Sequence, residues 1–260
     1  FDGEYARLYV DGTLIATSAK FSSGKIGYNS TSSSNLAMGY GSLGNSILGY
    51  MDDTDYHNID RVGHRRWLLN PEMGKVGFGI VGRYSDTYVF DWSGTTKYTY
   101  DAICWPASQM PMELFYGYEA WSVNLGENFG TPDINAVTVT LTRTRDGQTW
   151  TFDKNNKDLG GRFFNVENSG YGITKCIIFR PENLTITEGD VFQVTIRGLT
   201  DTAGNQTSYS YKVTFFSVKN PQKMKPSIKR ATFSKVYDQT YTGKSIKPNV
   251  TIKYSGKTLV

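Results

Sequence analysis

The stretch "AVTVTLTRTRDGQTWTFD" at residues 136–153 decides the fold of the central part of this 260-residue chain. Threonine alternates with Val and Leu in its first run, and with Trp and Phe in its second. A period of two is typical of a strand with one buried face, and the Asp-Gly pair between the runs is typical of a turn. The stretch therefore predicts two β-strands joined by a turn.

Runs of the same kind fill residues 100–218. They read "WSVNL", "CIIFRP", "DVFQVTIRGL" and "YSYKVTFF", and they are separated by the turn-like segments "NNKDLGG", "ITEGD" and "DTAGNQ". The stretch "LGENFG" at residues 125–130 is interpreted as a further turn. Several short strands with turns between them predict an antiparallel β-sandwich over residues 100–218.

Residues 1–99 have a mixed pattern. Ile47, Leu48 and Met51 have helical spacing in "NSILGYMDD", and "HRRWLLNP" allows about two helical turns before Pro71 prevents simple continuation. The runs "KVGFGIVG" and "DTYVFDW" predict two strands, whereas "GEYARLYVDG" fits a strand or a helix end. A mixed α+β domain is therefore expected here.

The C-terminal part is basic. Residues 219–225 are interpreted as a linker, and residues 226–260 resume strand-like runs that are too short to bury their own core. Residues 217–260 carry 10 basic side chains against Asp238, a net charge of +9 (10 − 1). This excess favours anionic polymers as partners, or it is simply the solvated surface of a strand domain.

Composition excludes other classes of protein. No run approaches the roughly 18 apolar residues of a membrane span. The chain also lacks a helix that carries the basic residues and the aromatic–basic interleaving of a nucleic-acid module. Cys104 and Cys176 both lie in apolar, strand-like runs, so either one disulfide or two free buried thiols fits the sequence.

Three segments together indicate a family. Residues 63–79, "GHRRWLLNPEMGKVGFG", resemble the Gly-His-Arg…Ile-Leu-x-Pro…Val-Gly-x-Gly segment of bacterial SCP-like extracellular proteins in the CAP superfamily. Residues 33–39, "SSNLAMG", resemble that family's Gly-Glu-Asn-Ile-Ala segment, and "SILGYMDD" lies where the family has a helix ahead of the histidine. The resemblance covers roughly residues 20–99. It implies a three-layer αβα domain over residues 1–99, truncated at its N-terminus, in a protein outside the cell or on its surface.

The last segment resembles a second family. "YTGKSIKPNVTIKYSGKTL" at residues 241–259 is similar to the opening of bacterial Ig-like repeats on Gram-positive cell-surface proteins. The resemblance implies that residues 226–260 are a fragment of such a repeat. Anionic cell-wall polymers are then the expected partners of the basic C-terminal segment.

The CAP resemblance also implies a cleft. Many CAP proteins hold a divalent cation there with two histidines and two acidic residues. His64 matches the histidine of the Gly-His motif and Asn35 matches the asparagine, but Ser34 replaces the first acid. The second acid would be Asp52 or Asp53, and the sequence does not distinguish between them.

The expected cleft is degenerate in its ligands because no histidine precedes His57. His57 is a weak substitute, since Gly63 and a non-helical segment separate it from His64. One histidine and one aspartate are too few for a typical zinc site, so no cofactor is expected. Arg65 would bind a carboxylate or phosphate at the cleft rim, or form a solvated pair with Arg66.

Two roles are open for His64 and for a cluster of aromatic residues. His64 either serves the cleft or packs at a helix start with one ring nitrogen on a carboxylate such as Asp52 or Asp53. The aromatic residues either stack on sugar rings or, as we favour, form a seam between domains. They are Trp105, Phe115, Tyr116, Tyr118 and Trp121.

The sequence therefore predicts a non-catalytic binding protein. Its degenerate cleft would bind a peptide, glycan or lipid, with the β-modules as spacers or wall-binding elements. The alternative is a metal-dependent or His/Asp-assisted hydrolase, with His64 as base or ligand. The chain has no Gly-x-Ser-x-Gly motif, and the apolar setting of Cys104 disfavours a thiolate.

Overall fold

The computed structural model describes residues 7–10, 13–17, 31–95, 99–158, 160–219, 232–235, 237, 243, 250–254 and 257–259. One compact unit extends from Phe1 to Phe216, and a second from Ser217 to Val260. The predicted boundary after residue 99 therefore falls inside the first unit, whereas the predicted boundary after residue 218 lies close to its end.

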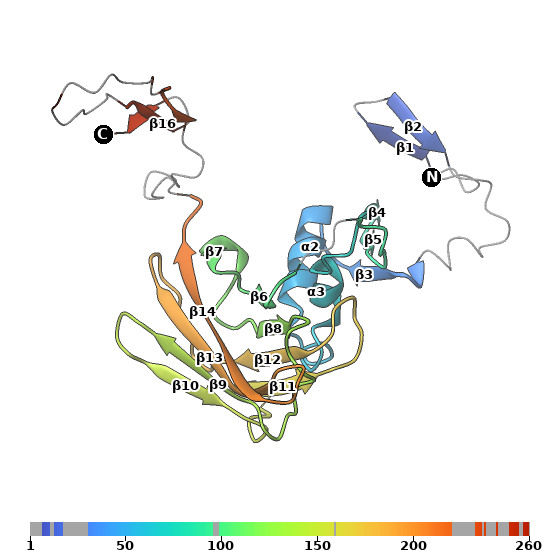
Figure 1. Cartoon of the computed structure of the whole chain (residues 1–260). Coiled ribbons are helices and arrows are strands. Elements are labelled where there is room, and N and C mark those ends of the chain that lie inside the picture. Colours follow the sequence, from blue (N-terminus) through green and yellow to red (C-terminus); the bar gives the residue numbers. More distant parts are fainter. Residues whose placement is uncertain are drawn as a thin grey trace. The chain divides into compact units, whose positions relative to one another are not determined.

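The first unit consists mainly of β-strands (Figure 1). Its described strands are β1 (Arg7–Val10), β2 (Thr13–Thr17), β3 (Ser34–Met38), β4 (Gly77–Val81), β5 (Tyr84–Tyr88), β6 (Ala102–Trp105), β7 (Gln109–Pro111), β8 (Trp121–Leu125), β9 (Thr138–Arg143), β10 (Thr149–Phe152), β11 (Phe163–Glu167), β12 (Cys176–Arg180), β13 (Val191–Thr200) and β14 (Gln206–Phe216). Its described helices are α2 (Leu43–Asp52), α3 (Gly63–Leu68) and the 3-10 helix η1 (Met112–Leu114).

Two sheets form the predicted β-sandwich. A five-stranded sheet has the order β10-β9-β13-β14-β7, and a four-stranded sheet has the order β11-β12-β8-β6. Neighbouring strands run antiparallel except for β14 and β7, which are parallel. The two strands predicted within residues 136–153 are confirmed as β9 and β10, with Leu141 opposite Trp150. The segment 125–130 forms the expected turn.

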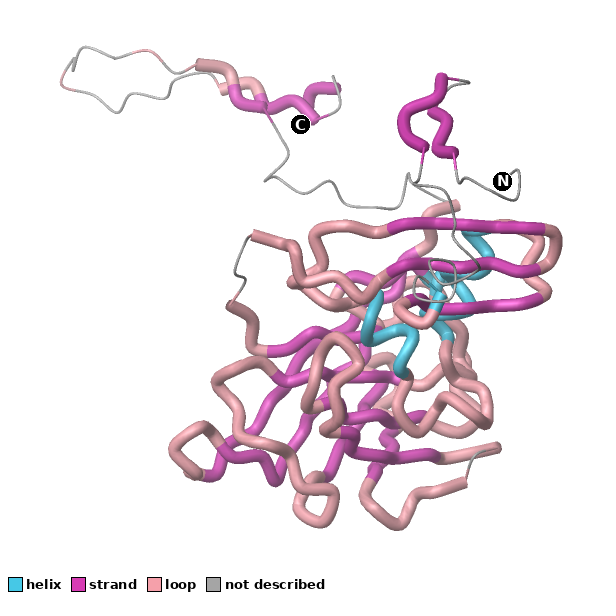
Figure 2. Tube along the Cα trace, turned by 90° about the vertical axis from the view of Figure 1, so that its right-hand side faces the viewer, coloured by secondary structure: helices cyan, strands magenta, loops and turns pink. Residues whose placement is uncertain are grey.

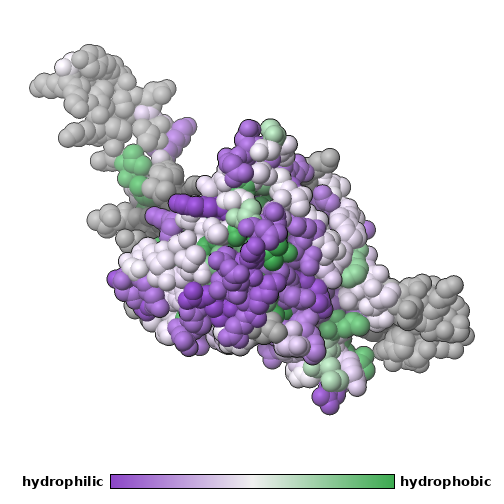
Figure 3. All heavy atoms as spheres, turned by 90° about the horizontal axis from the view of Figure 1, so that it is seen from below, coloured by the Kyte–Doolittle hydropathy of each residue, from purple (hydrophilic) through white to green (hydrophobic). Residues whose placement is uncertain are grey.

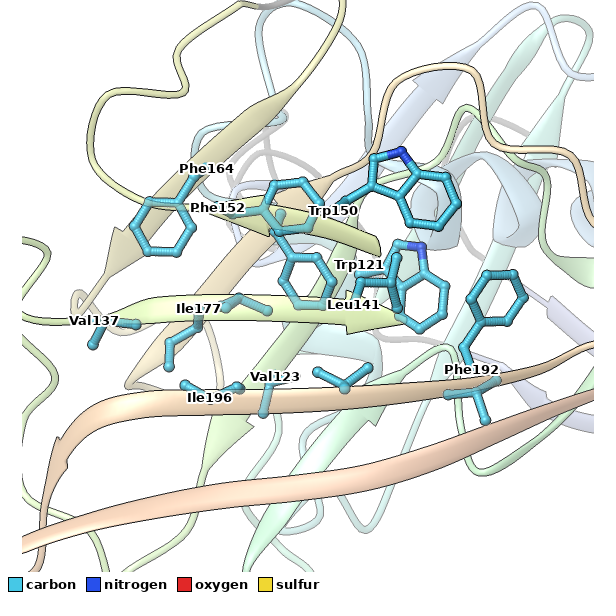
Figure 4. Packing of buried hydrophobic residues seen from close by; sticks show 14 of the residues in the cluster. Trp121, Val123, Val137, Leu141, Trp150, Phe152, Phe164, Ile177, Phe192 and Ile196 are labelled. Carbon is cyan, nitrogen blue, oxygen red and sulfur yellow. The ribbon is translucent and has the colours of Figure 1, made fainter. Parts of the chain in front are cut away.

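Large apolar side chains from both sheets meet in one core (Figure 4). The alternation in β9 and β10 places Val139, Leu141 and Phe152 in this core and leaves the intervening threonines facing away from it. From the other sheet, the Trp121 ring stacks on Phe179 at 5.7 Å between ring centroids. The period-two pattern therefore identified the buried face correctly.

The four-stranded sheet is covered on its other face as well. All five residues of β8 are buried, and so are all five residues of β12. A second apolar cluster lies on this outer face and includes side chains from the segment before α3. Its members are Ile59, Val62, Ala120, Phe163, Cys176 and Ile178. Residues 55–68 and the sandwich thus share one continuous interior.

Residues 31–95 contribute a small sheet and two helices. The sheet has the order β3-β5-β4, and Figure 2 shows the helices between this sheet and the strands of the sandwich. Both predicted helices are confirmed, as is a strand in the centre of "KVGFGIVG", whereas only the first three residues of "DTYVFDW" belong to strand β5. Helix α2 begins after Ser42, whose Oγ accepts the backbone N–H of Asn45 at 3.2 Å. It ends at Asp53, which has a left-handed backbone with φ 46°.

The three-layer αβα arrangement expected for residues 1–99 is wrong. The two helices are short, and both lie on the sandwich side of the small sheet. On the other face of that sheet, Leu36, Met38, Tyr84 and Tyr88 are exposed, so no helical layer within the described residues covers it. The first unit is a β-rich fold in which a sheet and two short helices pack on a β-sandwich.

The structure also shows the state of the two cysteines and the positions of the aromatic cluster. Cys104 and Cys176 are both free, and burial raises their pKa values to about 12 and about 11. Of the aromatic cluster, Trp105, Phe115 and Trp121 belong to or pack on the core of the sandwich itself, inside one compact unit, and not in a seam between two domains. The other two members, Tyr116 and Tyr118, are more than half exposed.

The second unit contains three short antiparallel strands. They are β15 (Thr232–Phe233), β16 (Ile252–Tyr254) and β17 (Lys257–Leu259), in the order β15-β16-β17. Strands are thus confirmed where residues 226–260 are described. Most of the predicted linker 219–225, and the segment 1–6 that opens "GEYARLYVDG", lie outside the described residues, while the rest of that run includes strand β1.

Most of the surface seen in Figure 3 is hydrophilic over the described residues. No helix among them is both long enough and apolar enough to cross a bilayer.

We predict that Phe152→Ala lowers the free energy of unfolding by about 3–5 kcal/mol, because the ring is fully buried between the two sheets and its loss leaves a cavity. Urea unfolding followed by tryptophan fluorescence measures the change. Phe78→Ala is the matched control, because Phe78 is 55% exposed and its removal should change stability by less than about 0.5 kcal/mol. Equal losses in the two variants would contradict the placement of the core.

Candidate functional site

His64 is held by Asp53 at the start of helix α3. The ring Nδ1 lies 2.8 Å from Asp53 Oδ1, and Asp53 is almost fully buried. Since an ionised carboxylate only accepts hydrogen bonds, Nδ1 carries the proton in this contact. Asp53 Oδ2 also accepts the backbone N–H groups of His64 (2.9 Å) and Arg65 (3.3 Å). One carboxylate therefore orients the imidazole and satisfies the first N–H groups of the helix.

Strand β3 and helix α2 complete the frame of the histidine. Asn35 Nδ2 donates to the backbone carbonyl of His64 at 3.0 Å, and the Tyr50 hydroxyl donates to the carbonyl of Asn35 at 2.9 Å. The Tyr50 ring also stacks on the His64 ring, with centroids 5.4 Å apart. These contacts fix the plane of the imidazole and leave its Nε2 edge on the partly exposed side.

His64 lines a pocket of about 240 Å³. Polar and aromatic groups share its wall. The lining residues are Ser34, Asn35, Asn58, Arg61, Gly63, His64, Trp67, Phe90 and Tyr171. Trp67 and Phe90 stack with ring centroids 3.9 Å apart, and the exposed Trp92 packs edge-on against Trp67 at 5.2 Å. A rigid group of rings thus lies next to an oriented hydrogen-bonding side chain.

The structure brings together most of the predicted cleft residues. Ser34, Asn35 and His64 line the same pocket, and the choice between the two aspartates is resolved because Asp53 is the one on the imidazole. His57 is exposed, and it is not among the residues that line the pocket. The interpretation of His64 as a residue anchored by a carboxylate is confirmed, and it is compatible with a binding role.

Arg65 and Arg66 are not solvated, contrary to one of the two sequence interpretations. Both side chains are fully buried, so neither lies at a cleft rim. Arg65 donates from Nε to the Met51 carbonyl (2.6 Å), from Nη1 to the Ala120 carbonyl (2.8 Å), and from Nη2 to the Asp52 carbonyl. Nη1 also lies 3.1 Å from Ser122 Oγ. The guanidinium thereby joins the end of α2 to strand β8.

Arg66 likewise connects α3 to a distant segment of the chain through hydrogen bonds. Its Nε donates to the Ile173 carbonyl at 3.0 Å, and its Nη2 donates to the Ser169 carbonyl. The guanidinium also lies 5.2 Å from the ring centroid of Tyr171, a cation–π contact at the edge of the His64 pocket. Both arginines are therefore structural hydrogen-bond donors.

A pair of carboxyl groups, Asp52 at the end of α2 and Glu119, lies outside the His64 pocket, and the sequence indicated only Asp52. Asp52 and Glu119 line a pocket of about 300 Å³ that does not include His64. Burial raises the pKa of Glu119 to about 7, with nearby Asp52 adding to the effect and Arg65 opposing it. Burial also raises the pKa of Asp52. Glu119 sits in the aromatic run "FYGYEAW", and no spacing to another acid in the sequence indicates it.

The His64 pocket has few of the groups that catalysis requires. Within the described part of the chain, no cluster of three or more His, Cys, Asp and Glu side chains could hold a metal ion. An oriented imidazole can accept a proton or a ligand's hydrogen bond. The arrangement therefore fits ligand binding directly. For hydrolysis, the imidazole would act as a base that activates a water molecule.

Comparisons with protein-family models, with curated proteins and with solved structures gave no match. The functional conclusion therefore rests on the geometry of the site.

We predict that Arg65→Met lowers the free energy of unfolding by about 3–5 kcal/mol, because it leaves the buried carbonyls of Met51, Asp52 and Ala120 without their donor. Chemical denaturation measures the loss. Arg83→Met is the control, since Arg83 is exposed. A loss in Arg65→Met no larger than in this control would show that the guanidinium does not hold the two parts together.

We predict that Glu119→Gln is more stable than the wild type at pH 8 but not at pH 4. A carboxyl whose pKa is raised from 4.5 to about 7 on folding adds stability that is complete below pH 4.5 and is lost as the pH rises through about 7. Glutamine keeps the acceptor that takes the Tyr116 N–H at 2.9 Å, and it avoids the ionisation cost, about 3 kcal/mol at high pH. Thermal or urea unfolding from pH 4 to 8 measures the difference, and a difference independent of pH would refute the raised pKa.

Proposed function

We propose that this chain is a non-catalytic ligand-binding protein and that the pocket around His64 is its ligand site. The observation that carries the proposal is the contact between Asp53 and His64 at 2.8 Å beside the stacked rings of Trp67 and Phe90. A binding pocket typically combines apolar surface with a few oriented polar groups, and this one combines both on rigid elements.

The lining chemistry favours a glycan over a peptide or a lipid. A sugar ring has an apolar face that stacks on aromatic rings, and it carries hydroxyl groups that exchange hydrogen bonds with amide and imidazole groups. The pocket offers Asn35, Asn58 and His64 for the hydroxyls, and Trp67 and Tyr171 as aromatic neighbours. A purely apolar lipid chain would offer the imidazole of His64 no hydrogen-bond partner.

The resemblance of residues 20–99 to SCP-like extracellular proteins supports the same proposal, together with a location outside the cell or on its surface. This proposal does not include the αβα fold, which the structure contradicts. In this proposal the β-sandwich and the C-terminal strands act as spacers or wall-binding elements, and the basic segment 217–260 attracts anionic wall polymers.

A hydrolase remains the second candidate, and one observation favours it. A histidine whose Nδ1 is held by a buried aspartate is a common arrangement for a general base. The same experiment distinguishes the two candidates, because hydrolysis releases new reducing ends and binding does not.

The test titrates the full chain with soluble tetrasaccharides of β-1,4-linked glucose and of β-1,4-linked N-acetylglucosamine, a neutral tripeptide, and a lysophospholipid below its micellar concentration. Intrinsic tryptophan fluorescence and calorimetry measure binding. We expect a tetrasaccharide to bind, and His64→Ala to weaken it at least tenfold, about 1.4 kcal/mol. His57→Ala, an exposed histidine outside the pocket, should leave the affinity unchanged.

Three outcomes would contradict the proposal. Failure of every probe to bind, or equal binding by the wild type and His64→Ala, would remove the pocket as the ligand site. New reducing ends that disappear in His64→Ala would replace binding with hydrolysis.

A further inference from the structure

The pocket lined by helix α2 and Glu119 has the features of a separate ligand site. It has a volume of about 300 Å³ and lies between α2, the end of η1 and the segment that leads into β8. Its lining residues are Tyr40, Asn45, Leu48, Gly49, Asp52, Glu113, Leu114, Tyr116, Tyr118 and Glu119. It has no lining residue in common with the His64 pocket.

Glu119 is the buried group that points to a ligand. The residue is only 2% exposed and lines the pocket. Its Oε1 accepts the backbone N–H of Tyr116 at 2.9 Å, but its Oε2 is buried and accepts no well-formed hydrogen bond. The indole N–H of Trp105 and the charge of Arg65 only partly offset its burial. A buried carboxyl oxygen without a partner is costly, so a donor from a ligand would relieve that cost.

Asp52 presents a second oxygen of the same kind. Its Oδ1 is buried and accepts no well-formed hydrogen bond, and the hydroxyls of Thr54 and Tyr118 only partly offset the rise in its pKa that burial causes. Its closest cation is Arg65, whose donors are already directed to the backbone carbonyls of Met51, Asp52 and Ala120. Arg65 therefore lowers the local negative potential without satisfying either oxygen.

Tyrosine rings form the outer wall of this pocket. Tyr116 and Tyr118 are stacked, with centroids 5.7 Å apart and planes 4° from parallel, and both are more than half exposed. Tyr40 adds a third ring. Tyrosine faces attract cations and also pack on apolar chains. Burial raises the pKa of Tyr118 to about 12, with nearby Asp52 and Glu119 adding to the effect, so its ring is neutral near pH 8.

The charged side chains that line this pocket are all acidic. It includes the carboxyl groups of Asp52, Glu113 and Glu119 and no Lys, Arg or His side chain. An inorganic divalent cation fits poorly, because no cluster of potential ligands that could hold a metal occurs within the described residues. An organic cation fits better, since its charge meets the carboxylates while its carbon stem contacts the rings.

We propose that this pocket binds an alkylammonium group, of a free amine or of a lysine side chain, with Glu119 and Asp52 as hydrogen-bond acceptors and the tyrosine rings around the carbon stem. The inference is independent of the function proposed for the His64 pocket.

The test is calorimetry on the full chain at pH 8, where Glu119 is largely ionised and an aliphatic amine, with a pKa of about 10.4, is protonated. The probes are n-hexylamine, Nα-acetyl-lysine N-methylamide, and their uncharged counterparts hexan-1-ol and Nα-acetyl-norleucine N-methylamide. We expect at least one charged probe to bind and the uncharged counterparts to bind at least tenfold more weakly. Binding of only the lysine derivative would identify a peptide side chain as the source, and binding of only hexylamine would identify a free amine.

Variants connect binding to the pocket. Glu119→Gln should weaken the charged probe at least tenfold, and Tyr118→Leu, which keeps an apolar side chain but removes the ring, should weaken it about threefold to tenfold. Glu188→Gln changes the net charge equally at an exposed position of the sandwich, and it should have no effect. His64→Ala should also have no effect, which separates this site from the other pocket.

Three results with these probes and variants would overturn the proposal, and a fourth comes from a competition with calcium. They are no binding of either charged probe, equal binding of the charged and uncharged probes, and an affinity unchanged by Glu119→Gln. Displacement of the amine by stoichiometric calcium, measured in the same cell, would replace the organic cation with a metal and would equally overturn it.

Discussion

Four oxygen atoms surround the guanidinium of Arg65, and they come from two different parts of the fold. The carbonyls of Met51 and Asp52 end helix α2, whereas the Ala120 carbonyl and the Ser122 hydroxyl belong to the start of strand β8. A buried guanidinium must keep its partners, so the two parts cannot shift independently. This constraint bears on both pockets, because α2 lines the pocket of Asp52 and Glu119 and its Tyr50 ring stacks on His64 in the other pocket.

The end of helix α2 also directs the neighbouring carboxyl groups of Asp52 and Asp53 to different places. Asp52 ends the helix, and Asp53 adopts a left-handed backbone with φ 46°, a conformation that Asp tolerates better than most residues. The chain reverses there, so Asp53 turns to the imidazole of His64 while Asp52 lines the other pocket. The two aspartates therefore have different roles. Asp53 orients the His64 ring, whereas Asp52 has a buried carboxyl oxygen without a well-formed hydrogen bond.

The sequence predicted the elements well and their packing less well. Most strands of the sandwich and the helices α2 and α3 follow from local periodicity, which depends only on neighbouring residues, although the runs of β7 and β11 were not predicted. The burial of Arg65 and Arg66 could not be read locally, because their acceptors Ala120 and Ile173 are 55 and 107 residues away. The αβα expectation failed for a related reason: short motifs indicate a local likeness, but they do not show what covers the far face of a sheet. Of the candidate site, His64, Ser34 and Asn35 were found from sequence, and Glu119 was not, since its role depends on a turn that folds against α2.

The double coverage of the four-stranded sheet has a practical consequence for anyone dissecting this chain. A fragment that starts at residue 100 would keep every strand of the sandwich, yet it would bare Ala120, Cys176 and Ile178 to water. Such a freshly uncovered apolar surface invites self-association, and the free thiol of Cys176 would become open to oxidation. Expression trials should therefore treat the first unit as indivisible.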